Sequence, residues 1–79
     1  MMNPIFSQRL SELRKENNLT LEALGEIIGL TKSAVGNIEK GRKPASLEVV
    51  YKTAEHFDVS IDYLLGRTDN PKINTTPLE

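Results

Sequence analysis

The sequence has no cysteine among its 79 residues and few aromatic side chains, which make up 5% of the chain. Without thiols, neither a disulfide nor a thiolate-bound metal can stabilise the fold, so stability must come from packing. A chain of this length holds one domain and lies near the lower limit for a fold supported by a hydrophobic core alone. The absence of cysteine also fits a reducing cytosol.

Long apolar runs are absent as well, although 38% of the residues are hydrophobic. A membrane-spanning helix needs roughly 20 consecutive apolar residues, so we expect no membrane association. The first ten residues, MMNPIFSQRL, lack the basic segment and long apolar stretch of a secretory signal. We therefore expect a soluble, cytoplasmic protein.

The chain lacks the excess of positive charge that marks many nucleic-acid-binding domains, since its net charge is −1. However, residues 29–43 hold four cations and one anion, a local charge of +3, which leaves −4 for the remainder. Because charges more than about 8 Å apart are strongly screened at physiological ionic strength, the acidic remainder does not prevent this segment from binding DNA. The four cations are Lys32, Lys40, Arg42 and Lys43.

Apolar residues recur at helical spacing in five segments, and no segment alternates as a strand would. Each segment follows a residue whose side-chain oxygen can cap a helix; these residues are Asn3, Thr20, Thr31, Ser46 and Ser60. The pattern predicts an all-α fold with helices at about Pro4–Glu16, Leu21–Ile28, Lys32–Lys40, Leu47–Phe57 and Ile61–Leu65. In the fourth helix, the spacing predicts a buried face formed by Leu47, Val50, Ala54 and Phe57.

The C-terminal residues differ in character from the rest. Segment 67–79, RTDNPKINTTPLE, is polar, contains two prolines and shows no periodicity. Such a composition favours an extended or flexible chain. We expect a helical domain in residues 1–66 and a flexible tail in residues 67–79.

Only Gly29, Leu30 and Thr31 separate the second and third predicted helices. This is the turn length of a helix-turn-helix, whose second helix enters the major groove of DNA. On the third helix, a polar face lies opposite Val35 and Ile38. Its side chains suit contacts with base edges: they are Lys32, Ser33 and Asn37. Contacts with the DNA backbone are predicted for Thr31, Gly36, Lys40, Arg42 and Lys43.

These assignments have plainer alternatives. The polar face of the third helix can be an ordinary solvated face, and the basic residues after it can serve to keep a loop soluble. Gly36 costs roughly 1 kcal/mol of helix stability relative to alanine. It is therefore either a poorly optimised helix position or a place where the backbone approaches DNA closely.

Four segments follow one another at a characteristic spacing: FSQRLSELR (6–14), LTLEALGEIIGLT (19–31), KSAVGNIEKG (32–41) and SLEVVYKTAEHFDVSIDYLLG (46–66). In order and spacing they resemble the Cro/repressor-type helix-turn-helix family, also called the XRE family. The resemblance covers residues 6–65. The following GRTDNP is similar to the same stretch of short phage-type and Firmicute-type regulators.

The resemblance implies a compact, five-helix, lambda-repressor-like DNA-binding domain in residues 1–66. It implies a transcriptional regulator, most often a repressor, that binds a pseudo-palindromic operator as a dimer. It places base contacts at Lys32, Ser33 and Asn37, and it implies an internal ion pair between Arg14 and Glu39. We expect the dimer interface around the fifth helix, at Phe57, Ile61 and Tyr63.

The sequence departs from the family pattern on the second and third helices. Leu21 stands where the family usually has glutamine, Gly25 and Gly36 replace alanine and serine, and Ile27 occupies a usually polar position. Leu21 and Ile27 are expected to leave apolar surface, which can mark a partner site. An alternative function is therefore a protein-interaction module, antitoxin-like or adaptor-like, that works chiefly by capturing another protein.

Catalytic and metal-binding patterns are not recognisable. His56 is the single histidine and lies near acidic residues, but one imidazole without thiols is a weak set of metal ligands. We find no serine, histidine and acid arrangement and no glycine-rich phosphate loop, and the domain is small for a catalytic cleft. We expect a non-enzyme without metal or cofactor. Its expected partners are double-stranded DNA, a second copy of the chain and a regulatory protein.

Overall fold

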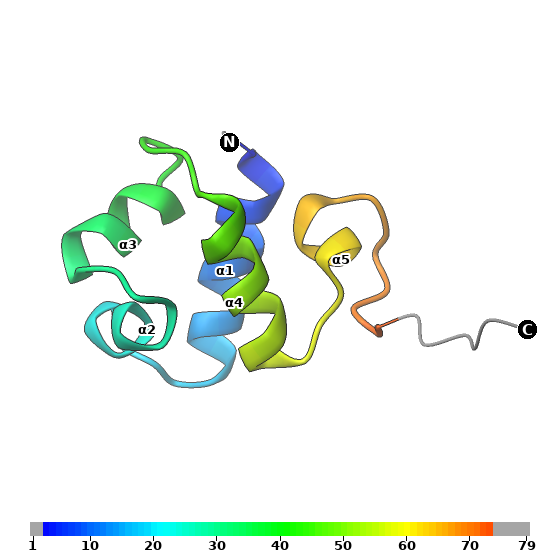
Figure 1. The fold of residues 1–79 in the computed structure, drawn as a ribbon, viewed down its shortest axis with the longest axis horizontal. Coiled ribbons are helices and arrows are strands. Elements are labelled where there is room, and N and C mark those ends of the chain that lie inside the picture. Colours follow the sequence, from blue (N-terminus) through cyan, green and yellow to red (C-terminus); the bar gives the residue numbers. More distant parts are fainter. Residues whose placement is uncertain (1–2, 74–79) are drawn as a thin grey trace, which may run out of the picture.

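The structure is a computed structural model that describes residues 3–73, and this part consists of five α-helices without a strand (Figure 1). The helices are α1 Pro4–Glu16, α2 Leu21–Ile28, α3 Lys32–Glu39, α4 Leu47–Phe57 and α5 Ile61–Leu65. The predicted all-α fold is confirmed. One boundary is wrong by a residue: α3 ends at Glu39, because Lys40 is its C-cap and Gly41, with φ 73°, turns its N–H back to Ile38 O.

Side-chain caps set where each helix begins. Asn3 Oδ1 accepts hydrogen bonds from the N–H groups of Ile5 and Phe6 at 2.9 and 3.0 Å. In the other four helices, a capping hydroxyl accepts from the N–H three residues later. The first turn of a helix has N–H groups without partners inside the helix, and these caps satisfy one or two of them. The four hydroxyl caps are Thr20, Thr31, Ser46 and Ser60.

The described helices enclose a hydrophobic core to which all five contribute. Thr53 lies within it and donates its hydroxyl to Val49 O at 2.8 Å, so its burial leaves no unpaired group. From α3, Val35 and Ile38 enter the core, which fixes the side of α3 that faces solvent. The largest fully buried side chains are Phe6, Leu10, Leu24, Ile28, Val35, Val50, Thr53 and Leu64.

The prediction that Leu47 belongs to the buried face of α4 is wrong. Its side chain is 70% exposed. At 100° per residue, Leu47 lies about 90° from the centre of the buried arc, which falls between Val50 and Thr53. Leu47 therefore faces solvent on the first turn of α4. The buried residues of this helix are Val49, Val50, Thr53 and Ala54.

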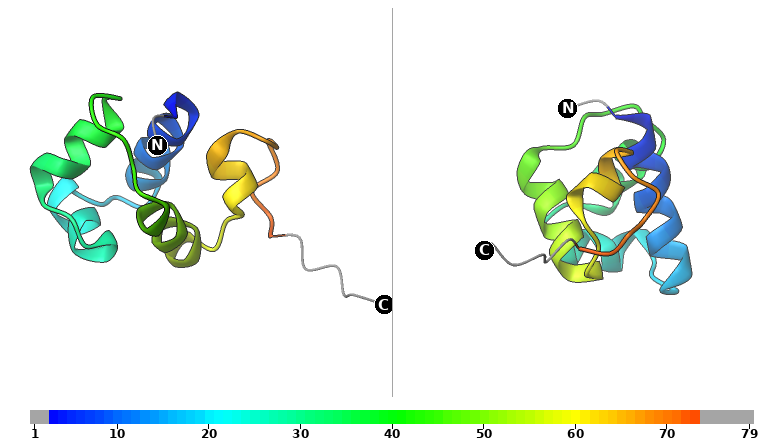
Figure 2. Two further views of the ribbon diagram at one scale, coloured as in Figure 1. Left: turned by 45° about the horizontal axis from the view of Figure 1, so that its top comes forward. Right: turned by 90° about the vertical axis from the view of Figure 1, so that its right-hand side faces the viewer.

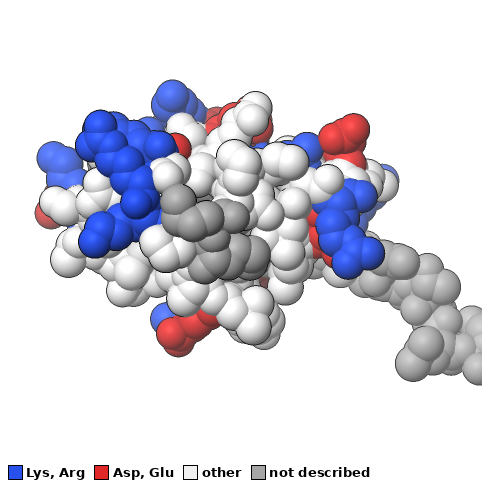
Figure 3. Space-filling view, turned by 90° about the horizontal axis from the view of Figure 1, so that it is seen from above, with Lys and Arg blue, Asp and Glu red and all other residues white. Residues whose placement is uncertain are grey.

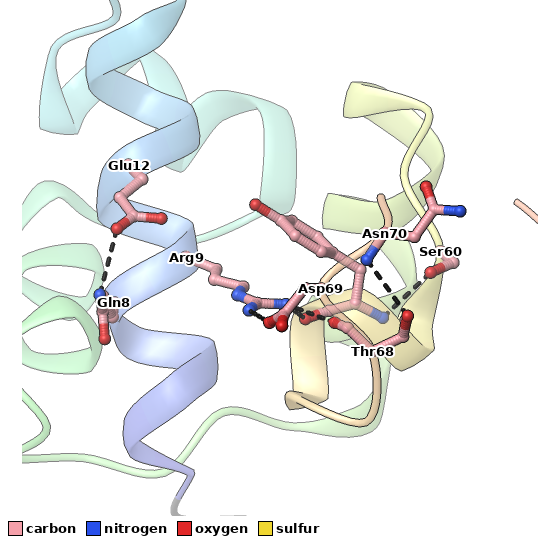
Figure 4. A network of polar contacts seen from close by, with 8 residues as sticks. Gln8, Arg9, Glu12, Ser60, Thr68, Asp69 and Asn70 are labelled. Carbon is pink, nitrogen blue, oxygen red and sulfur yellow. Dashed lines mark hydrogen bonds and ion pairs between the residues drawn. The ribbon is translucent and has the colours of Figure 1, made fainter. Parts of the chain in front are cut away.

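The chain after α5 folds back against α1, and Arg9 lies at the centre of this contact (Figure 4). The Arg9 guanidinium donates to the backbone oxygens of Tyr63 and Thr68. It also forms an ion pair with Asp69 at 3.0 Å and lies 3.9 Å from the centre of the Tyr63 ring. One arginine thus joins α1, α5 and the segment that follows α5.

A further hydrogen bond holds the same segment to the start of α5. Ser60 N–H donates to Pro71 O at 2.9 Å. Residues 67–73 have no regular secondary structure, yet these contacts tie them to α1 and α5. The sequence did not predict this attachment. Residues 74–79 of the predicted tail lie outside the described residues, and the domain boundary at residue 66 stays a prediction.

The elements are distributed along one long axis. Figures 1 and 2 show α2 and α3 at one end, α5 and the following segment at the other, and α1 and α4 between them. A ligand at α3 therefore leaves the α5 end free. Within residues 3–73, no helix has the length and apolarity needed to cross a membrane.

Candidate nucleic-acid interface

The turn between α2 and α3 is built around two glycines. Gly29 ends α2 with a left-handed backbone, φ 75°, which favours glycine. Leu30 N–H donates to Gly25 O at 2.8 Å, and a Cβ added at Gly25 would lie 2.4 Å from Leu30 O. Glycine at position 25 therefore lets the turn lie directly on α2. Thr31, whose hydroxyl accepts from Ala34 N–H at 3.1 Å, then begins α3.

One side of α3 is buried and the other is available for contacts. Val35 and Ile38 pack in the core, whereas Lys32 and Ser33 are exposed and Asn37 is half-buried. These three polar residues lie on the first two turns, away from the core. The structure thus brings together the three side chains predicted to contact bases. Their contact with DNA stays a prediction.

Asn37 also anchors the loop that follows α3. Its backbone oxygen accepts from Arg42 N–H at 2.9 Å and from Lys43 N–H at 3.3 Å, so the loop folds back over the end of the helix. The positive φ of Gly41 permits this reversal. Arg42 and Lys43 are exposed, as is Lys40 at the end of α3. The loop therefore places these cations beside the polar face of α3.

The charge distribution in space follows from this arrangement. Figure 3 shows lysine and arginine side chains gathered at the end of the molecule that carries α3, with few acidic side chains among them. A surface of this kind attracts the phosphates of nucleic acids, and the attraction weakens as salt increases. The end of the molecule that carries α3 is therefore basic, although the net charge of the whole chain is slightly negative.

A largely buried ion pair joins α3 to α1. Arg14 Nε and Nη2 donate to the two carboxylate oxygens of Glu39 at 2.8 and 3.1 Å. Arg14 Nη1 donates to Leu19 O at 3.0 Å, and only 16% and 9% of the Arg14 and Glu39 side chains are exposed. The hydrogen bond to Glu39 raises the pKa of Arg14, although burial opposes it. This forked contact fixes the orientation of α3 on α1.

Leu21 and Ile27, expected to leave apolar surface on α2, are both half-buried and pack against the core. Leu21 reaches α3: a Cβ built at Gly36 would lie 3.8 Å from Leu21 Cδ1, an ordinary contact distance. The fold therefore admits a small side chain at Gly36. The large exposed apolar residues in the described part of the chain are instead Ile5, Leu47, Tyr51 and Ile73.

The predicted dimer interface lies on α5 and at the end of α4. Phe57, Ile61 and Tyr63 are half-buried and pack against the core. The Tyr63 ring faces the Arg9 guanidinium. The rings of Phe57 and His56 are perpendicular, with their centres 4.9 Å apart. Their role in dimerisation stays a prediction.

The acidic residues near His56 do not converge on it as metal ligands would. Among residues 3–73, no group of three histidine, cysteine, aspartate or glutamate side chains is placed to hold a metal ion. Asp58 is the C-cap of α4, and Asp62 lies in the first turn of α5. The expectation of a protein without metal or cofactor stays a prediction.

The fold and the exposed face of α3 define a helix-turn-helix domain. A family model described as helix-turn-helix, HTH_3, matches residues 10–64. The chain belongs to this family, the Cro/repressor-type or XRE regulators, as its sequence motifs predicted.

Curated relatives include two regulators of Bacillus subtilis. The uncharacterised HTH-type transcriptional regulator YobD is 45% identical over 67 residues, which cover 85% of this chain and 60% of YobD. The HTH-type transcriptional regulator AnsR is 41% identical over 59 residues, which cover 75% of this chain and 51% of AnsR. The chain therefore spans between half and three-fifths of the length of these relatives.

Solved structures with the same fold include the regulators C.AhdI and SinR. The restriction-modification controller protein C.AhdI from Aeromonas hydrophila has a TM-score of 0.69 and 38% identity, covering 77% of this chain and 92% of its own. SinR of Bacillus subtilis in complex with DNA has a TM-score of 0.67 and 33% identity, and the match covers 76% of this chain and 97% of the SinR chain. SinR in complex with the SinI protein has a TM-score of 0.68 and 33% identity, and the match covers 76% of this chain and 59% of the SinR chain. The lambda-repressor-like fold is confirmed.

Proposed function

We propose that this protein is a DNA-binding transcriptional regulator that acts as a repressor by occupying an operator. The observation that carries the proposal is the exposed polar face of α3, which the Arg14–Glu39 ion pair holds in place beside a cationic loop. The names of the relatives and the SinR–DNA complex support it. We further propose that the protein has no catalytic activity and that it acts in the cytoplasm.

The proposed roles of the residues follow from their chemistry. Lys32 donates to guanine or to phosphate, Ser33 pairs with several bases, and the Asn37 amide matches the donor and acceptor of adenine. Phosphate contacts position the domain on DNA without reading its sequence. The residues proposed to contact the DNA backbone are Thr31, Gly36, Lys40, Arg42 and Lys43.

The protein is proposed to bind as a homodimer on a pseudo-palindromic site. One recognition helix covers only a few base pairs, and two half-sites about 34 Å apart are needed for usable specificity. The proposed interface, at Phe57, Ile61 and Tyr63, lies on α5 and at the end of α4, outside the predicted DNA-contacting face of α3.

Selection of bound duplexes from a randomised DNA pool, followed by affinity measurements across a salt series, tests the proposal. We expect an inverted repeat, with a log–log slope that corresponds to several phosphate contacts. Recovery of no sequence above background would contradict it.

A second proposal is that the protein works chiefly by binding another protein. Leu47 and Tyr51 favour it, because they are large, exposed and one turn apart on α4. SinR, a similar chain, forms a complex with SinI. Purification from the native host decides between the two: a stoichiometric protein partner together with no DNA affinity at moderate salt would favour this alternative.

A further inference from the structure

Gly36 interrupts a row of lysines on the exposed side of α3. Lys32, Gly36 and Lys40 are spaced four residues apart, so they lie one above another along the helix. Lys32 and Lys40 are exposed, and Gly36 is half-buried. At the middle of this row the helix therefore presents backbone where a side chain would otherwise stand.

Leu21 of α2 borders that position. A Cβ built at Gly36 would have Leu21 Cδ1 at 3.8 Å and, among described residues beyond its own helix backbone and chain neighbours, no other heavy atom within 4 Å. Leu21 is half-buried, and glycine at position 36 places no side chain beside its Cδ1 on the cationic side of α3. We call this feature, formed by Leu21 and Gly36, the apolar notch.

We propose that the apolar notch receives the C5-methyl group of a pyrimidine in the major groove, which makes Leu21 and Gly36 determinants of sequence specificity and gives Gly36 this role in place of a contact with the DNA backbone. This inference rests on the proposed DNA-binding function. The C5-methyl group of thymine is the apolar group that the major groove presents, and side-chain carbons recognise it by contact. Lys32 and Asn37, which flank the notch along α3, are the side chains proposed to reach neighbouring base edges.

The two members of the notch act through different physical effects. Leu21 supplies the apolar surface, and a glutamine at that position would replace a methyl group with a hydrated amide. Gly36 adds no side chain there, and the Cβ of a serine would stand 3.8 Å from Leu21 Cδ1, an ordinary contact distance. Leu21→Gln and Gly36→Ser should therefore fold, and both should remove methyl recognition.

The test measures affinity for the selected operator after each thymine is replaced by deoxyuridine, which removes only the C5-methyl group. With the unchanged protein, we expect one position in each half-site to lose about fourfold in affinity, the equivalent of about 0.8 kcal/mol for one buried methyl group. With Leu21→Gln or Gly36→Ser, that position should become insensitive. Leu21→Met, which keeps an apolar side chain, should retain the sensitivity.

A second series separates thymine from methylated cytosine as the source of the methyl group. An operator with cytosine at the sensitive position should bind the unchanged protein more weakly than an operator with 5-methylcytosine there. The Leu21→Gln variant should bind these two operators equally. Leu47→Gln, the same change at an exposed leucine of α4, should leave both series unchanged. If 5-methylcytosine brings no gain while deoxyuridine still weakens binding, the notch recognises thymine alone.

The outcomes distinguish this inference from the proposed function. A selected operator whose deoxyuridine sensitivity is the same for the unchanged protein and for Leu21→Gln would overturn the notch and leave the repressor proposal standing. The absence of any selected operator would overturn both. Thermal unfolding of each variant verifies that the comparison is made between folded proteins.

Discussion

At the scale of single residues, Asn37 combines two roles that one substitution can separate. Its side chain is proposed to read a base, whereas its backbone oxygen holds the N–H groups of Arg42 and Lys43. Asn37→Ala keeps the backbone contact, so the loop should stay in place. We expect it to weaken operator binding by about 1–3 kcal/mol and to relax the preference at one base pair. Normal operator affinity for Asn37→Ala would show that the base contact is misassigned.

Arg42→Ala is the matched change for a phosphate contact. Because a phosphate carries no sequence information, the variant should weaken binding to operator and scrambled DNA alike. The slope of log affinity against log salt should fall by about one, since one fewer counterion is released. Titrations of both duplexes at several salt concentrations measure the effect. Loss confined to the operator would instead indicate a base contact.

The Arg14–Glu39 ion pair should matter most for stability. Because both side chains are largely buried, removal of one partner leaves an uncompensated charge. We expect Arg14→Ala to lower the free energy of unfolding by about 3–5 kcal/mol, measured by urea denaturation. The pKa of Arg14 is raised in the folded protein. The stabilisation that its charge provides is therefore complete at pH values below the ordinary pKa of arginine, and it is lost as the pH rises through the higher folded-state pKa.

The double variant Arg14→Met with Glu39→Leu provides the control. It removes both charges and keeps apolar volume, so it should cost less than the single change. A loss below about 1 kcal/mol for Arg14→Ala would mean that α3 is held by its core residues alone.

At the scale of elements, Gly25 and Gly36 form a matched pair of helical glycines. Gly25→Ala would place its Cβ 2.4 Å from Leu30 O, so the turn must shift, and we expect a loss of about 1–3 kcal/mol. Gly36→Ala meets only an ordinary contact with Leu21, so the better helix propensity of alanine should stabilise the protein by about 1 kcal/mol. Thermal and urea unfolding of both variants measure the difference, and equal effects would contradict the tight α2–α3 turn.

At the scale of the whole molecule, Arg9 connects parts of the chain that are far apart in sequence. Arg9→Gln removes the ion pair to Asp69 and the donors to two backbone oxygens. We expect the segment after α5 to detach, so that the Ser60 amide, bonded to Pro71 O, exchanges with solvent about tenfold faster. Hydrogen exchange followed by NMR measures this.

Arg67→Gln is the control for that experiment. Arg67 and Asp62 are exposed and 3.9 Å apart, and surface pairs of this kind contribute little. In Arg67→Gln, the Ser60 amide should exchange at the same rate as in the unchanged protein. The exchange rates of the α3 amides should be the same in both variants as in the unchanged protein. Equal exchange of Ser60 in Arg9→Gln and in the unchanged protein would mean that Pro71 holds the segment without Arg9.

The helices and their bounds could be predicted because their signals are local. A capping oxygen acts on N–H groups two or three residues away, and apolar periodicity spans a few turns, so Asn3 or Thr31 can be interpreted without the fold. The gathering of cations after α3 was predictable for the same reason. The Arg14–Glu39 pair was not local, and only the family resemblance implied it.

The amino-acid sequence by itself determined the helix-turn-helix class, the polar face of α3 and the basic loop beside it. The tertiary structure decided that Leu47 is exposed, that Gly25 touches Leu30 O, that Leu21 borders Gly36 and that Arg9 holds the segment after α5. Each of these depends on how two elements pack at a particular angle and register. Such packing is a property of the whole chain, because burial and long-range contacts arise only when all the helices are in place.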